Sequence, residues 1–220
     1  MRIDKLVNTA SSETWNITKA KCEFTLENLR ILLILRAFSA NNYYTDRACS
    51  APLEVYSELF AMSKEQTVLD FKKAMEELLT LAITPRVEHT ITGWLSSYEF
   101  TDQGKVKFYW NPEVSRLAEE GSAFGPFRLY HLKGLSSVLA LKLFRFLNPL
   151  AVYKQHCGYT EVLADFLNLE DFTGNAKELK QLLLPAVDEI NKSTTLTISS
   201  ITNMGKGLKF KMQRKSYVKK

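Results

Sequence analysis

The sequence has few of the residues that form covalent cross-links or bind metals. Its 220 residues include only three cysteines and three histidines. Cys22, Cys49 and Cys157 lie far apart with no C-x-x-C pair. This spacing argues against a disulfide framework or a zinc site and suits a reducing cytosol. The histidines are also isolated from one another in the sequence: they are His89, His131 and His156.

Long apolar runs are absent as well. The longest one, Leu29–Leu35, contains Arg30 and is followed by Arg36, so it is far too short to span a bilayer. The segment Met1–Val7 lacks the apolar core of a signal peptide. We therefore expect a soluble intracellular protein with no membrane partner.

Motifs for enzymatic chemistry are missing too. No G-x-x-x-x-G-K-[ST] loop occurs, because the glycines of Gly205-Lys-Gly207 lack its spacing. Cys157 follows His156, but neighbours in sequence seldom form a catalytic dyad. Asp188-Glu189 fits a helix surface better than an acid–base pair. We predict no enzyme activity, no catalytic residue, no cofactor and no bound metal.

The basic residues, by contrast, are concentrated in one part of the chain. Hydrophobic residues make up 45%, which is enough for ordinary cores. Residues 1–115 carry 13 basic and 15 acidic side chains, whereas residues 116–220 carry 16 and 9. The segment Gly205–Lys220 alone has seven basic side chains and no acid. Local basicity of this kind is typical of nucleic-acid binding, although a solubilising tail is the plainer alternative.

Two halves with a shared plan are visible on either side of residues 118–126. That stretch has two glycines, a proline and small polar residues, so it is predicted to be a linker. The expected domains are therefore 1–117 and 127–220. In the first half, apolar spacing and capping residues predict helices over 26–39, 52–62 and 64–83, then strands over 87–100 and 105–110.

The second half repeats this order. Its predicted helices span 127–147, 160–167 and 175–192, and its predicted strands 195–201 and 208–212 flank a glycine-tipped turn at 204–207. Three helices followed by a hairpin is the winged-helix order. The predicted fold is α+β, with two tandem winged-helix domains related by an internal pseudo-repeat. The third helix has one apolar stripe: Ala176, Leu179, Leu183, Ala186, Val187 and Ile190.

Several segments in this order resemble the iteron-binding plasmid replication initiators of the Rep_3 superfamily. They include Phe71-Lys-Lys-Ala-Met-Glu-Glu-Leu-Leu79, Gly104-Lys-Val-Lys-Phe108, Leu141–Leu147 and, most specifically, Pro185-Ala-Val-Asp-Glu-Ile-Asn191. The resemblance implies a cytoplasmic bacterial protein that binds repeated double-stranded DNA sites at a plasmid origin and helps to open it. It also implies host partners such as a helicase or initiator, autorepression, a role in copy control, and a homodimer through the first domain.

The residues expected to touch DNA follow from helix and wing geometry. A recognition helix reads base edges chiefly with its N-terminal part, and Lys and Gln suit guanine and adenine edges. The base-reading candidates are Asn175, Lys177, Lys180 and Gln181. The backbone-contact candidates are Lys64, Lys73, Lys105, Lys107, Lys206, Lys209, Lys211 and Arg214. A merely solvated helix face explains the first group about as well, and the adjoining basic wing favours DNA.

The first domain is predicted to be the weaker DNA reader. Asp70, Glu76 and Glu77 on its third helix repel phosphate. Apolar or aromatic residues there suit a dimer interface, although core packing explains each of them at least as well. These residues are Tyr43, Tyr44, Phe108 and Trp110.

Two other functions fit the same pattern. One is a winged-helix transcriptional repressor that binds a single palindrome as a dimer. The other is a protein-interaction module with an incidental basic tail. A steep salt dependence of DNA binding distinguishes either DNA-binding protein from the module, because phosphate contacts release counterions.

Overall fold

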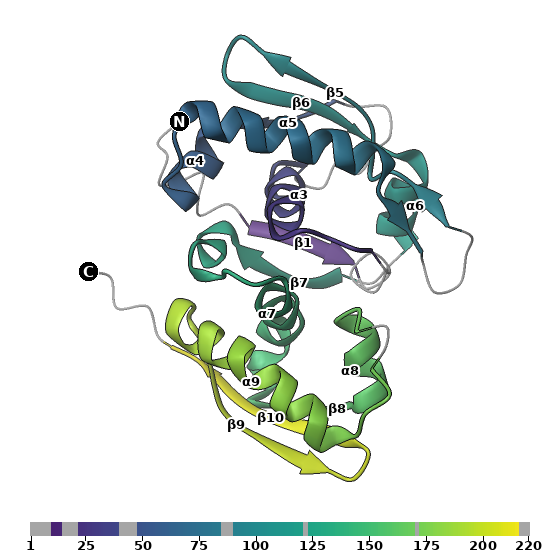
Figure 1. Ribbon diagram of the computed structural model, residues 1–220, viewed down its shortest axis with the longest axis vertical. Helices are drawn as coiled ribbons and strands as arrows, with labels where there is room; N and C mark the ends of the chain where they lie inside the picture. Colours follow the sequence, from purple (N-terminus) through teal and green to yellow (C-terminus); the bar gives the residue numbers. More distant parts are fainter. Residues whose placement is uncertain are drawn as a thin grey trace. The chain divides into compact units, whose positions relative to one another are not determined.

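The protein is described by a computed structural model for residues 10–14, 22–39, 48–84, 90–120, 123–169 and 172–215. The chain divides into two compact units, Met1–Tyr130 and His131–Lys220. Each unit combines helices with antiparallel strands, so the predicted α+β class is confirmed (Figure 1). Among the described residues, no helix combines the length and the apolar character needed to cross a bilayer.

One almost fully buried helix organises the first unit. The helices of this unit are α3 (Leu26–Ser39), α4 (Glu54–Phe60), α5 (Lys64–Thr80) and α6 (Pro112–Glu120). Leucine and isoleucine on all sides of α3 bury it nearly all round, as expected for a helix without a polar face. Figure 1 shows α5 passing over α3. The Oγ atom of Ser63 accepts a hydrogen bond from the Gln66 amide at 3.1 Å and so fixes the start of α5.

The sheet of the first unit ends in a hairpin after the third helix. Its strands are β2 (Cys49–Pro52), β5 (Leu95–Thr101) and β6 (Lys105–Trp110), in the order β2-β6-β5. The hairpin turn needs Gly104, which has a φ of 68°. Two short pairs complete the unit: β3 (Ala82–Ile83) with β4 (Ile91–Thr92), and β1 (Ala10–Thr14) with β7 (Ala123–Arg128).

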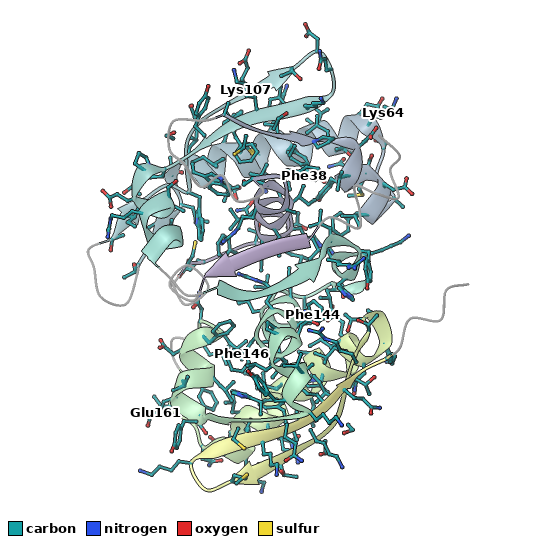
Figure 2. The ribbon with its side chains drawn as sticks, turned by 180° about the vertical axis from the view of Figure 1, so that it is seen from behind. Phe38, Lys64, Lys107, Phe144, Phe146 and Glu161 are labelled. Carbon is teal, nitrogen blue, oxygen red and sulfur yellow. The ribbon has the colours of Figure 1, made fainter. Side chains whose placement is uncertain are left out.

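The second unit has the same plan in a smaller form. After the 3-10 helix η1 (Leu129–Gly134) come α7 (Val138–Leu150), η2 (Ala151–Tyr153), α8 (Thr160–Phe166) and α9 (Ala176–Ser193). The strands are β8 (Gln155–Tyr159), β9 (Leu196–Met204) and β10 (Gly207–Arg214), in the order β8-β10-β9. Figure 1 shows α9 lying along the β9–β10 hairpin. The core is filled from α7, where Phe144 and Phe146 lie in the interior of the unit (Figure 2).

Several sequence predictions need correction. Helix α5 ends at Thr80, and Ala82–Ile83, predicted as the end of this helix, form strand β3. Residues 118–120 and 123–126, predicted to belong to a linker, form the end of α6 and most of β7, and β7 is a strand because it pairs with the distant strand β1. The predicted helix over 127–147 is two helices, η1 and α7, separated by residues 135–137. The third strand of each sheet, β2 and β8, was not predicted, because each is short and pairs only through tertiary contact.

The break before α7 has a steric and a capping cause. A Cβ atom on Gly134 would lie 2.3 Å from the Cβ atom of Ser193, so only glycine allows η1 to approach the end of α9 this closely. Ser137 then starts α7, since its Oγ atom accepts a hydrogen bond from the Ala140 amide at 3.1 Å. η1 therefore ends at Gly134, and the Ser137 cap sets the start of α7.

Candidate DNA interface

The third helix of the second unit, α9, presents one apolar and one polar face. The six residues predicted for the apolar stripe are its buried residues, so this prediction is confirmed. Lys177 and Gln181 are exposed one turn apart, and Lys180 is half-buried at the edge of the stripe. The structure therefore brings these three candidates together on the first two turns of α9. That is the part of a recognition helix that reads bases.

Asn175 has a second role that the sequence prediction did not include. Its Oδ1 atom accepts hydrogen bonds from the amides of Lys177 at 2.9 Å and Glu178 at 3.2 Å. The Glu178 carboxylate accepts from the Asn175 amide at 3.0 Å, which completes a capping box. Because the Asn175 oxygen holds the helix start, only its Nδ2 group is suited to contact a base.

The hairpin β9–β10 forms a wing with a tight turn. Its two-residue loop has Gly205 at a φ of 58°, which the first position of such a turn requires. Lys206, the second loop residue, is exposed. Lys209 and Lys211 follow on the same face of β10, the face opposite to buried Leu208 and Phe210. The sequence of the wing, from Leu196 to Arg214, contains no acid.

Arg214 differs from the three wing lysines. Its Nη2 atom donates a hydrogen bond to the Asn148 carbonyl oxygen at 2.7 Å, near the end of α7. This hydrogen bond ties the last residue of β10 to helix α7. It also uses part of the guanidinium group that was predicted to contact phosphate. We expect Arg214 to contribute to DNA binding mainly through the position of the wing.

Two polar side chains on the last turns of α9 brace the helix against its neighbours. The Glu189 carboxylate accepts hydrogen bonds from the amides and hydroxyls of Ser136 and Ser137, among them Ser137 Oγ at 2.8 Å. The Asn191 side chain pairs with Ile198 of β9: Oδ1 accepts from its amide at 2.6 Å and Nδ2 donates to its carbonyl at 3.0 Å. Glu189 thus holds α9 to the start of α7, and Asn191 holds it to the wing.

This brace lies within the segment Pro185–Asn191, on which the family resemblance most depended. Sequence reasoning placed Asp188-Glu189 on a helix surface and gave Asn191 no role. The serine partners of Glu189 lie 52 or 53 residues away in the sequence. Ile198 lies seven residues from Asn191, beyond the end of the helix. No local sequence pattern therefore revealed either contact. Leu184 is 36% exposed on the polar face of α9.

The corresponding surface of the first unit is less basic. Lys64 lies at the start of α5 and Lys107 on β6 (Figure 2), and both Lys64 and Lys105 are exposed. The Lys107 ammonium lies over the Tyr109 ring, and Lys107 is paired in register with Glu99. Lys73 forms a surface ion pair with Glu77 at 4.0 Å. These acids offset the local charge, so the surface around the four lysines is less positive than the wing of the second unit.

Two of the four residues predicted for a dimer interface of the first unit lie in its core. Phe108 and Trp110 are buried in the core, and Trp110 Nε1 donates to Ser39 Oγ at 2.9 Å. Core packing therefore explains both residues in this structure. Tyr43 and Tyr44 lie outside the described residues.

Helices followed by a hairpin in both units define a tandem winged-helix protein, and the helix–wing surface of the second unit is of the nucleic-acid-binding kind. Residues 12–148 match the family model described as "Initiator Replication protein, WH1". This match covers more than half of the chain. The protein belongs to this family of replication initiators.

Solved structures support the same fold. The chain is similar to the Pi initiator protein, whose crystal structure is in complex with iteron DNA, with a TM-score of 0.75 and 15% identity; the match covers 96% of this chain and 99% of that one. It is also similar to domains 2 and 3 of RctB, with a TM-score of 0.52 and 8% identity, over 95% and 92% of the two chains. No curated protein matches the sequence.

Proposed function

We propose that this initiator binds repeated double-stranded DNA sites, or iterons, at a plasmid origin and helps to open it. The observation that carries the proposal is the surface of the second unit, where the start of α9 and an acid-free basic wing belong to one braced structure. The similarity to the Pi initiator, which was crystallised with iteron DNA, supports the same function.

In this function α9 and the β9–β10 wing have different roles. Lys177, Lys180 and Gln181 read base edges in the major groove, where lysine suits guanine and glutamine suits adenine. Lys206, Lys209 and Lys211 contact phosphates, which positions the protein without specifying a sequence. The first domain, for which we propose residues 1–117, lies within the first unit and adds backbone contacts from Lys64, Lys73, Lys105 and Lys107.

Partners follow from the same proposal. The chain has no nucleotide-binding loop in its sequence, so strand separation beyond the bound site requires a host helicase or initiator. A homodimer through the first unit that represses its own promoter would limit plasmid copy number. Such a protein acts in the bacterial cytoplasm and needs neither catalysis nor a cofactor of its own.

Footprinting of the full chain on the DNA that flanks its own gene, at two salt concentrations, tests the proposal. We expect evenly phased protection over several direct repeats, weaker at high salt because phosphate contacts release counterions. A single symmetric footprint would establish a palindrome-binding repressor instead. The absence of any salt-sensitive footprint would identify a protein-interaction module.

A further inference from the structure

Three side chains form an apolar patch on the outer face of the second sheet, at the turn end of the wing. They are Cys157, Tyr159 and Met204, which we call the tip patch. Gly207 of β10 is paired in register with both Tyr159 and Met204, and Cys157 Sγ lies 3.9 Å from Met204 Sδ. Tyr159 is 70% exposed and Met204 is 53% exposed. Large apolar side chains from two edge strands are thus gathered on one open surface.

The tip patch is held in place and does not lie on a free hairpin. The amide and hydroxyl of Thr160 both donate to the Lys206 carbonyl oxygen, at 3.0 and 2.9 Å. A Cβ atom on Gly207 would lie 2.6 Å from the Gly158 carbonyl oxygen, so the strands meet here at a distance that only glycine permits. Figure 1 shows β8 and α8 beside the turn end of the hairpin. These connections make the tip a stiff support for its exposed side chains.

The charges around the tip patch favour a polyanion. Lys206 lies in the turn, and Lys209 is paired in register with Cys157. The wing itself contains no acid. The first acid after Tyr159 in the sequence is Glu161, which is exposed on α8 (Figure 2). An apolar surface bordered by ammonium groups matches bases bordered by phosphates.

We propose that the tip patch presses on the bases of the bound duplex, with Met204 wedged at one base step in the minor groove. The inference rests on the proposed function and adds to it a means of deforming the DNA. Apolar wedges of this kind, methionine among them, unstack a step and kink the duplex by roughly 20–90°. The wing lysines offset the cost of unstacking, because a bent duplex brings its phosphates closer to them.

The test uses the full chain and a duplex that carries the footprinted site. The fluorescent adenine analogue 2-aminopurine replaces one adenine at a time, and its emission rises when it is unstacked. We expect the wild-type protein to raise the emission at one step, Met204→Gln to lose this rise, and Met204→Leu to keep it. Val152→Thr is the matched control: Val152 is 62% exposed, on η2 at the other end of the same sheet.

Cys157 supplies a second, independent readout. It is exposed, whereas Cys22 and Cys49 are buried and report any unfolding. We expect bound DNA to slow the alkylation of Cys157 by a maleimide. Unchanged alkylation in the saturated complex, or an emission rise that persists in Met204→Gln, would overturn the wedge. Failure of the wild-type protein to bind this duplex specifically would instead refute the proposed function.

Discussion

At the scale of single residues, polar side chains on α9 divide between those that face solvent, for which we propose base reading, and those that hold the helix in place. Lys177 and Gln181 point into solvent from the first two turns, whereas Asn175 and Glu178 close the helix start by a capping box. Glu189 and Asn191, at the other end, bind protein partners. Substitutions in the two groups should therefore affect different measurements.

The base-reading assignment can be tested by Lys177→Ala and Gln181→Ala. Each variant is expected to lose roughly 1–3 kcal/mol of discrimination between the specific site and unrelated DNA if its side chain reads a base. The measurement is the ratio of the two dissociation constants at one fixed salt concentration. Asp188→Ala, an exposed position further along α9, is the control that should leave the ratio unchanged. An unchanged ratio in both variants would show that α9 is not the recognition helix.

His156 gives the second unit a predictable response to acid. It is half-buried on β8 with its ring 5.2 Å from that of Phe146, and burial lowers its pKa. The pKa of His156 is therefore lower in the folded state than in the unfolded state, where it is about 6.5, so the unfolded state binds more protons. Stability should be unaffected above this pH and should fall as the pH drops through and below it.

His156→Phe isolates this effect, since phenylalanine cannot be protonated. The free energy of unfolding by urea, measured at several pH values from neutral to mildly acidic, should fall less steeply in the variant than in the wild type. Carboxylates titrate in both proteins and cancel in the comparison. Equal slopes would mean that His156 is protonated as readily in the folded state as in the unfolded one.

At the scale of elements, the wing is part of a joined structure. Asn191 links α9 to β9, Arg214 links β10 to α7, and Thr160 links α8 to the turn. A helix and a hairpin connected in this way keep a fixed spacing. DNA binding by one therefore restricts where the other can bind.

Asn191→Ala tests this linkage. The substitution leaves the amide and carbonyl of Ile198 without their side-chain partners, so we expect a decrease of roughly 1–3 kcal/mol in the free energy of unfolding. Specific DNA binding should weaken more than non-specific binding, because the wing loses its fixed position. Asn203→Ala, at an exposed site on the same strand, is the matched control and should change stability by less than about 0.5 kcal/mol. A variant as stable as this control would show that Asn191 does not brace the wing.

At the scale of the whole molecule, charge separates the two units. The first unit carries 15 basic and 17 acidic residues, and the second carries 14 and 7. Because phosphate neutralisation depends on local cations, the second unit should account for most of the salt dependence of DNA binding.

Two matched triple variants measure this difference in the full chain. Neutralising Lys206, Lys209 and Lys211 to glutamine should weaken binding to all DNA about equally and reduce the salt slope by about 0.9 for each phosphate that is no longer neutralised. Neutralising Lys64, Lys105 and Lys107 should reduce the slope less, because Glu99 and Asp102 already offset the first wing. Equal reductions would assign phosphate binding to both units alike.

The sequence alone determined the elements whose signals are local. The stripe from Ala176 to Ile190, the cap at Ser63 and the glycine turn at Gly205 each depend on side chains a few residues apart, so periodicity and turn chemistry predicted the α+β winged-helix order. The family resemblance rested on the same ordered segments.

Tertiary structure alone decided the features that depend on distant partners. β8 is a strand because β10 pairs with it, β7 is a strand because β1 pairs with it, and α7 starts where Glu189 from α9 binds Ser137. The tip patch likewise exists only because Gly207 brings Tyr159 and Met204 to one face. Pairing across a long stretch of chain leaves no periodic pattern in either partner, so only the folded molecule reveals it.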